Sequence, residues 1–305
     1  MSDEVGELRN SQDALSDAEE LRRRLRRDGY IFLRGLLARE DVVELRRALL
    51  EVCQRHGWLS AGSQLLDARV SRPPTQEGSA EFMPVYVEIQ KMEAFHRFAH
   101  QAALIDPIAR LLDEPVFVHP MKIARISFPN NVQQTTPSHQ DYVHIQGSFE
   151  TYTSWIPLGD VPRSLGGLAI LAGSHKLGIL QPRAAYGAGG LGLDVDSLGL
   201  PWHGTDYRAG DVLLFPSTAI HKALPNLSQD RLRLSVDYRY TGVTHAVGEG
   251  SLKPHYHWQV PELTYENIYR DWKSEDLKFY WKKLPLHVVP LTDAWAKMAR
   301  GDDKR

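Results

Sequence analysis

The sequence has little of what would assign it to several common protein classes. It contains a single cysteine, Cys53, among its 305 residues. An internal disulfide framework is therefore impossible, and a thiolate zinc site is not expected. No apolar run approaches the ~18 residues that a membrane-spanning helix needs. The segment Met1–Glu4 is not a basic stretch leading into an apolar one, so we expect no secretory signal and predict a cytoplasmic protein.

An excess of charge of one sign is also missing. Lysine and arginine total 36, aspartate and glutamate total 38, and the net charge is -2. Because no global positive field exists, we expect neither nucleic acid nor a membrane as a partner. Acidic residues lie beside the arginine-rich stretch at 21–27, which we interpret as a solvated helix face. A small molecule is the expected partner, and the oligomeric state is left open.

The distribution of residue types predicts disorder at 1–15 and a single domain at 16–305. Helical patterns occur at 17–27, 40–53 and 93–112, the last interrupted at Pro107, so residues 16–115 are expected to be mainly helical. Residues 246–305 are expected to form a C-terminal helical flank. Between them, residues 116–245 carry short β-rich runs separated by turn residues, which indicate an all-β sandwich or barrel. These runs lie at 116–128, 142–158, 167–171, 211–215 and 232–241.

A possible metal site begins with His139 and Asp141. In a strand, residues two apart point to the same face, so an imidazole and a carboxylate would lie side by side. A third ligand is expected at His221, which closes an apolar strand that starts after Gly210 and Asp211. Two histidines and one carboxylate on one face of a metal suit non-haem iron(II), because they leave positions open for a co-substrate and O₂.

A polar strand face follows this histidine. Alternation places Arg231, Arg233 and Ser235 on one face and leucines and a valine on the other. A guanidinium there could bind the far carboxylate of a dicarboxylate with two parallel hydrogen bonds, and Ser235 could add a hydroxyl donor. We predict Arg231 as this residue, although Arg233 shares its face and could do the same.

Taken together, these motifs resemble the phytanoyl-CoA dioxygenase family of iron(II)- and 2-oxoglutarate-dependent oxygenases. The resemblance covers roughly residues 21–241 and depends on motifs that occur in order. They are Asp28 to Gly35, His139-Gln140-Asp141, Gly166-Gly167-Leu168, Gly173-Ser174-His175, Gly210-Asp211, His221, Asn226-Leu227-Ser228 and Arg231.

The resemblance implies a fold, a reaction and a set of roles. The fold would be mainly β with flanking helices, built on a double-stranded β-helix, which is a jelly-roll, cupin-like core. The reaction would convert 2-oxoglutarate, O₂ and substrate into succinate, CO₂ and an oxidised substrate. His139, Asp141 and His221 match the iron ligands and Arg231 the 2-oxoglutarate arginine, whereas Gln140 and Trp155 lie where relatives line the 2-oxoglutarate pocket. Related halogenases lack the carboxylate, so Asp141 favours hydroxylation.

Several alternative interpretations remain at this point. The glycines at 187–192 match the spacing of a dinucleotide-binding fingerprint but lack the flanking strand and helix. We interpret residues 187–199 as a mobile loop that either gates the substrate or is a passive connector. His255-Tyr256-His257 followed by Glu262 imitates a cupin metal motif outside the β core. The chain could also be an inactive relative that binds a ligand or protein partner, or a cupin-like metalloenzyme that does not use 2-oxoglutarate.

Overall fold

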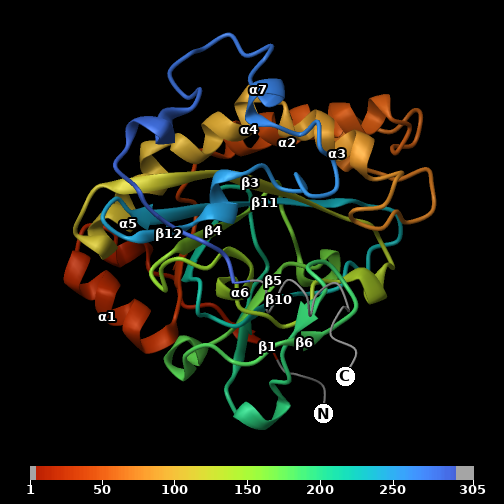
Figure 1. The fold of residues 1–305 in the computed structure, drawn as a ribbon. Helices are drawn as coiled ribbons and strands as arrows, with labels where there is room; N and C mark the ends of the chain where they lie inside the picture. Colours follow the sequence, from red (N-terminus) through yellow and green to blue (C-terminus); the bar gives the residue numbers. More distant parts are fainter. Residues whose placement is uncertain (1–4, 293–305) are drawn as a thin grey trace, which may run out of the picture.

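The fold is built from two main β-sheets, two small two-stranded sheets and a layer of helices (Figure 1). The computed structural model describes residues 5–292. The helices are α1 (Ala18–Asp28), α2 (Arg39–Arg55), α3 (Met83–Gln90), α4 (Glu93–Arg97), α5 (Ala102–Leu112), α6 (Tyr142–Ile145) and α7 (Tyr265–Ile268). The strands are β1 (Val5–Glu7), β2 (Ile31–Leu33), β3 (Val116–Ser127), β4 (Tyr152–Pro157), β5 (Leu168–Leu171), β6 (Arg183–Ala184), β7 (Leu191–Gly192), β8 (Trp202–Gly204), β9 (Val212–Pro216), β10 (His221–Ala223), β11 (Arg233–Gly242), β12 (Ala246–Gly248) and β13 (His287–Val289).

The two main sheets face each other as the halves of a jelly roll. The larger has the order β2-β9-β4-β11-β3, and the smaller has the order β1-β8-β5-β10. Their strands do not follow chain order, because the chain crosses repeatedly from one sheet to the other. Helices α2, α3 and α4 lie over the outer face of the larger sheet, and the smaller sheet lies on its other side (Figure 1). The predicted double-stranded β-helix with flanking helices is confirmed.

Strand β11 is buried on both faces, and its sequence alternation decides what each face contacts. Its apolar side chains pack in the main hydrophobic core with the helices. Tyr238 and Tyr240 extend that contact, since their hydroxyls donate hydrogen bonds to the carbonyls of Phe95 and Ala99 at 2.8 and 2.9 Å. The polar side chains of β11 point the other way, into the space between the two sheets. They are Arg233, Ser235, Asp237 and Arg239.

The helices mostly follow the sequence patterns. Helix α1 begins after Asp17, whose carboxylate accepts a hydrogen bond from the Glu20 amide, and it ends at Gly29 in a left-handed conformation with φ 78°. The expected interruption at Pro107 is wrong. The break falls at Gln101, whose backbone is extended, and α5 continues through Pro107. Pro107 lies in the middle of α5, where it removes one intrahelical hydrogen bond, and the helix tolerates this loss because its apolar face is buried.

Both ends of the chain differ from the prediction. Residues 1–4 lie outside the described residues, but residues 5–15 are ordered, because β1 pairs in parallel with β8 and Ser11 is buried. The C-terminal flank is not a run of helices. Up to residue 292 it forms β12, the four-residue helix α7, two short 3₁₀ helices, turns and β13, which pairs with β12. Its aromatic side chains, including Tyr265, Trp272 and Trp281, form a separate hydrophobic cluster. Residues 293–305 lie outside the described part.

Within residues 5–292, no helix combines the length and the apolar character that a membrane crossing requires.

Gly166 lies where the chain before β5 passes close to the chain after β10. Its φ is 77°, and a Cβ there would lie 2.4 Å from the carbonyl oxygen of Leu224. Gly57 has a similar φ of 70° but open space around it. We expect Gly57→Ala to cost about 1 kcal/mol of unfolding free energy from backbone strain. Gly166→Ala should cost about 1–3 kcal/mol more, because the backbone must move. Denaturant unfolding of both variants checks this, and equal losses would contradict the close approach.

Candidate active site

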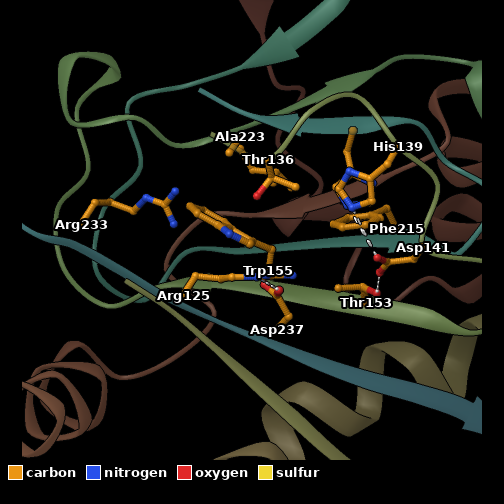
Figure 2. A pocket seen from close by; sticks show the side chains of 12 residues that line it. Arg125, Thr136, His139, Asp141, Thr153, Trp155, Phe215, Ala223, Arg233 and Asp237 are labelled. Atoms are coloured by element: carbon orange, nitrogen blue, oxygen red, sulfur yellow. Dashed lines mark hydrogen bonds and ion pairs between the residues drawn. The ribbon is translucent and has the colours of Figure 1, made fainter. Parts of the chain in front are cut away.

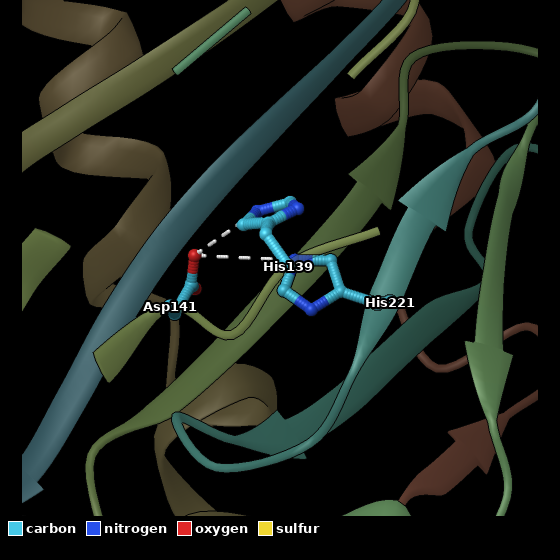
Figure 3. Close-up of side chains that lie close together, drawn as sticks. All are labelled: His139, Asp141 and His221. Carbon is cyan, nitrogen blue, oxygen red and sulfur yellow. Dashed lines mark ion pairs between the residues drawn. The ribbon is translucent and has the colours of Figure 1, made fainter. Parts of the chain in front are cut away.

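His139 and His221 are held side by side by a pair of backbone hydrogen bonds. Each amide donates to the other residue's carbonyl at 3.0 Å, which makes the two residues an antiparallel bridge between the chain before β4 and the start of β10. Residues paired in this way project their side chains to the same face. The imidazole ring centroids are 4.1 Å apart. Two imidazoles therefore converge on one point between the sheets (Figure 3).

The backbone also sets which nitrogen of each histidine faces the site. Nδ1 of His139 lies 2.8 Å from the carbonyl oxygen of Pro137, and Nδ1 of His221 lies 3.1 Å from that of Ala219. A carbonyl can only accept, so each Nδ1 carries a proton and each Nε2 is the nitrogen that faces the site. Burial lowers the pKa of His221 to about 3. Neutral imidazoles with an oriented Nε2 are suited to bind a metal.

Asp141 completes the group. Its Oδ1 lies 3.7 Å from Nε2 of His139 and 3.9 Å from Nε2 of His221. Potential ligand atoms of the three residues all lie within 4.8 Å of one another, and the described residues contain no other such group of histidine, cysteine or acidic side chains. The expected strand at 139–141 is wrong in one respect: Asp141 precedes the short helix α6 in an αR conformation. That turn, rather than strand alternation, brings the carboxylate beside the imidazoles.

Two side chains from the larger sheet hold the Asp141 carboxylate. Thr153 on β4 donates a hydrogen bond of 2.6 Å to Oδ2, and Nη2 of Arg239 on β11 lies 3.2 Å from Oδ1. Burial alone would raise the pKa of Asp141, but the neighbouring Arg239 guanidinium outweighs it and holds the pKa well below its ordinary value. The carboxylate is therefore ionised and fixed in orientation.

A cavity extends from these three residues toward Arg233 (Figure 2). It encloses about 430 Å³, including the part open to solvent, and Trp155, Phe215 and Leu168 form its apolar walls. Trp155 is 3% exposed and packs against Tyr207, with ring centroids 4.7 Å apart. The predicted position of Trp155 in a pocket wall agrees with this geometry. The cavity has the metal-binding group at one end and a guanidinium at the other.

The guanidinium at that end belongs to Arg233 and not to Arg231. Arg233 is 5% exposed and lines the cavity. Arg231 is exposed, comes before β11 begins, and forms a backbone bridge with Arg69. The prediction of Arg231 as the 2-oxoglutarate residue is therefore corrected. The two arginines are two residues apart, so strand alternation places both on the same face and could not distinguish them. They differ because β11 begins at Arg233, which leaves Arg231 outside the strand.

The other two predicted pocket residues have structural contacts. Ser235 is fully buried, and its hydroxyl accepts a 2.8 Å hydrogen bond from Nη1 of Arg233, so it orients that guanidinium. The Gln140 amide nitrogen donates to the carbonyls of Gly178 and Thr218 at 2.8 and 2.6 Å, and its oxygen accepts from the Leu180 amide. Gln140 therefore anchors neighbouring loops, and its prediction as a pocket residue is wrong.

The remaining motifs have other surroundings. The segment 187–199 includes β7 and pairs with β6, and it lies over the His139 segment through a 2.8 Å hydrogen bond from the Leu193 amide to the Ser138 carbonyl. Its gating role stays a prediction.

The histidines of the cupin-like motif have other contacts. His255 contacts the Tyr86 hydroxyl, and His257 contacts the Pro254 carbonyl. Neither histidine belongs to the metal-binding group, so the cupin-like motif at 255–262 is not a metal site here. The glycines at 187–192 are not followed by an α-helix, so the dinucleotide-binding motif also lacks the geometry that it requires.

Arg239, Thr153, Arg125 and Asp237 were not predicted from the sequence. The alternation that identified Arg233 and Ser235 continues to positions 237 and 239. Extending the pattern along the strand would therefore have predicted Asp237 and Arg239 as residues of the same face. Thr153 and Arg125 lie on the strands that flank β11. No short motif marks them.

Removing the carboxylate tests the metal-binding group. We expect Asp141→Ala to abolish tight iron(II) binding and oxidation, because one of three ligands is lost and Arg239 is left without its partner. Asp141→Asn retains the size of the side chain and serves as a control for folding. Anaerobic calorimetric titration with iron(II) checks both variants. Iron(II) affinity in Asp141→Ala equal to that of the unmodified protein would contradict the assignment.

Thr153 acts on the metal only through Asp141, so it is a positioning residue. Thr153→Val keeps the shape but removes the 2.6 Å hydrogen bond, and we expect iron(II) affinity to fall about 10- to 100-fold. Thr153→Ser restores the hydroxyl and should recover most of the affinity. The same titration, with thermal unfolding as a fold check, measures the effect. Equal losses in the valine and serine variants would show that packing, and not the hydrogen bond, matters.

The chain is similar to proteins of known activity. Residues 25–234 match the family model for phytanoyl-CoA dioxygenase (PhyH). A 1-deoxypentalenic acid 11-beta-hydroxylase of Streptomyces arenae is 29% identical over 272 residues, which cover 83% of this chain and 92% of that protein. The Streptomyces exfoliatus enzyme of the same name is 28% identical over 268 residues, with the same coverage of both chains.

Solved structures share the fold at lower identity. The epimerase SnoN in complex with Fe³⁺, alpha ketoglutarate and nogalamycin RO has a TM-score of 0.53 and 22% identity, over 76% of this chain and 86% of that one. EctD from S. alaskensis with bound Fe has a TM-score of 0.52 and 18% identity, over 96% and 94%. Because the family model covers more than half of the sequence, this chain belongs to the phytanoyl-CoA dioxygenase family of iron(II)- and 2-oxoglutarate-dependent oxygenases.

Proposed function

We propose that this enzyme hydroxylates a small organic molecule, with iron(II) bound by His139, Asp141 and His221 and with 2-oxoglutarate extending from the metal to Arg233. The curated relatives are named as hydroxylases of 1-deoxypentalenic acid, a small molecule. The presence of Asp141 leaves no ligand position for a halide of the kind that related halogenases use. Both points favour hydroxylation.

The three side chains fit iron(II) in chemistry and arrangement. Two neutral imidazole nitrogens and one ionised carboxylate are the ligand set that non-haem iron(II) oxygenases use, with the remaining positions open. When bound, iron(II) supplies the activation of O₂ that side chains cannot perform. The protein orients the ligands through the Pro137 and Ala219 carbonyls and fixes the carboxylate through Thr153.

The buried and incompletely paired guanidinium of Arg233 is the observation that supports a 2-oxoglutarate site in this cavity. Burial lowers the pKa of its guanidinium to about 10, so the charge lacks the full compensation that an arginine normally has. Its Nε has no hydrogen-bond partner among the described residues, while Nη1 is bound by Ser235. A carboxylate of the co-substrate would supply both the missing charge and a bidentate partner.

The walls of the cavity have a separate task. Trp155, Phe215 and Leu168 enclose the path between the metal-binding group and Arg233. Apolar walls exclude water from the reacting atoms and hold the substrate C–H bond in one orientation. The polar groups are concentrated at the two ends and along β11.

Two other functions are less consistent with the site. A non-catalytic relative would have no need for a complete, oriented metal-binding group. A metalloenzyme that does not use 2-oxoglutarate would have no use for a buried arginine facing the metal across a cavity. Release of succinate in the presence of iron(II), 2-oxoglutarate and O₂ separates both from the proposed function.

The two arginines provide a matched test. We expect Arg233→Ala to raise the KM for 2-oxoglutarate roughly 30-fold or more, since losing one partner of a buried charge pair costs about 2–5 kcal/mol. Arg233→Lys should rescue only partly, because an ammonium lacks the planar fork. Arg231→Ala, at the exposed neighbouring position, is the control and should leave this KM unchanged. A larger effect at Arg231 would contradict the assignment. Initial rates of succinate formation measure all three variants.

A further inference from the structure

A second cavity adjoins the one at the metal-binding group, and we call it the outer cavity, and the first the inner cavity, because it lies farther from that group. The two share Arg125, Thr136, Ala223 and Arg233 among their lining residues. The outer cavity encloses about 460 Å³, including its part open to solvent. Its lining is rich in side chains that form hydrogen bonds, namely Thr75, Glu77, Asn131, Gln134, Thr135 and Thr136. We assign the metal and 2-oxoglutarate to the strip between the metal-binding group and Arg233, so the rest of the two adjoining cavities, including the side at Asp237, is left for the substrate.

A partly buried ionic triad lies where the two cavities meet. Nε of Arg125 donates to Oδ2 of Asp237 at 3.0 Å, and its Nη1 donates to Oε1 of Glu77 at 2.9 Å. Burial opposes the charge on Arg125, but the two carboxylates outweigh it and raise its pKa above the ordinary value. Arg125 is therefore a fixed cation whose charge is already compensated. Figure 2 shows Arg125 and Asp237 together, beside Trp155 and apart from Arg233.

One oxygen of this triad has no partner. Asp237 is 7% exposed and lines the inner cavity, and its Oδ1 accepts no hydrogen bond within residues 5–292. A buried carboxylate oxygen without a donor is costly, so a donor is expected there when the site is filled. 2-Oxoglutarate cannot provide it, because it offers only acceptors and carries negative charge. Asp237 is also not part of the metal-binding group.

The charges around this oxygen also restrict the substrate. With Arg233 assigned to 2-oxoglutarate and the two histidines and Asp141 to the metal, the ionisable side chains that remain around the adjoining cavities are Arg125, Glu77 and Asp237. Two negative charges then face one positive charge that is already paired. A substrate carboxylate placed here would be repelled, whereas a hydroxyl or an ammonium group would be attracted.

We propose that Asp237 is a specificity-determining residue whose Oδ1 accepts a hydrogen bond from a hydroxyl or ammonium group of the substrate, and that this subsite rejects carboxylates. The proposal rests on the proposed function for the place of 2-oxoglutarate. It adds a substrate class: a small molecule with a hydrogen-bond donor near the carbon that is oxidised. Thr75, whose buried hydroxyl also has no partner among the described residues, is available for a second polar group of the same molecule.

The test uses three probes that share a phenyl ring: benzyl alcohol, benzylamine and benzoate. Binding is measured by ligand-observed NMR on protein loaded with 2-oxoglutarate and with zinc(II) in place of iron(II), which prevents turnover. We expect the unmodified protein to bind a donor probe about tenfold or more tightly than benzoate, as one hydrogen bond to a charged group allows. If benzylamine binds more tightly than benzyl alcohol, the subsite accepts an ammonium group. If benzyl alcohol binds more tightly, the subsite accepts a hydroxyl group.

Asp237→Asn should invert this preference. Its amide oxygen can still accept from Arg125, so the amide nitrogen turns into the cavity and becomes a donor that favours benzoate. Asp276→Asn is the control, because Asp276 is an exposed carboxylate paired with Arg97 outside both cavities. The proposal is overturned if the unmodified protein prefers benzoate, if it binds neither donor probe, or if Asp237→Asn retains the original preference. Binding of 2-oxoglutarate, titrated in the same samples, separately reports whether the proposed function fails.

Discussion

The polar inner face of β11 is the constraint on which the rest of the site depends. Four polar or charged side chains of one strand, Arg233, Ser235, Asp237 and Arg239, are buried between two sheets. Charges in such an interior need partners, since an unpaired buried charge costs several kcal/mol. Arg239 forms an ion pair with Asp141, and Asp237 forms one with Arg125. Arg233 has only a hydrogen bond to the Ser235 hydroxyl. The strand therefore supports the metal-binding carboxylate near one end and leaves an uncompensated cation near the other.

The opposite face of β11 explains why this arrangement is rigid. Its apolar residues pack against the helices, and Tyr238 and Tyr240 donate hydrogen bonds to the carbonyls of Phe95 in α4 and of Ala99 in the 3₁₀ turn that follows it. The helical layer thus fixes the strand from outside while the ionic contacts fix it from inside. A site built on paired strands holds its groups more accurately than one built on loops. The His139–His221 bridge extends this support to the smaller sheet.

The sequence predicted the parts of the site that depend on motif order and failed where local geometry decides. His139 and Asp141 could be found because they form a His-x-Asp motif, and His221 because it closes an apolar strand that starts after Gly210-Asp211. The arginine was misassigned because positions 231 and 233 have equal parity, and only the strand's first hydrogen bond distinguishes them. Gln140 could not be placed, because its neighbours at 178–180 and 218 are brought to it by tertiary structure. Pairing of β1 with β8 is likewise a long-range contact that a polar N-terminal sequence does not reveal.

The central claim is that iron(II) and 2-oxoglutarate occupy one cavity between His139, Asp141, His221 and Arg233. An anaerobic crystal structure of the protein with both bound tests this most directly. Our account predicts the metal on Nε2 of both histidines and on the Asp141 carboxylate, with the far carboxylate of 2-oxoglutarate on Arg233. A metal bound elsewhere, or a far carboxylate paired with a different cation, would contradict it.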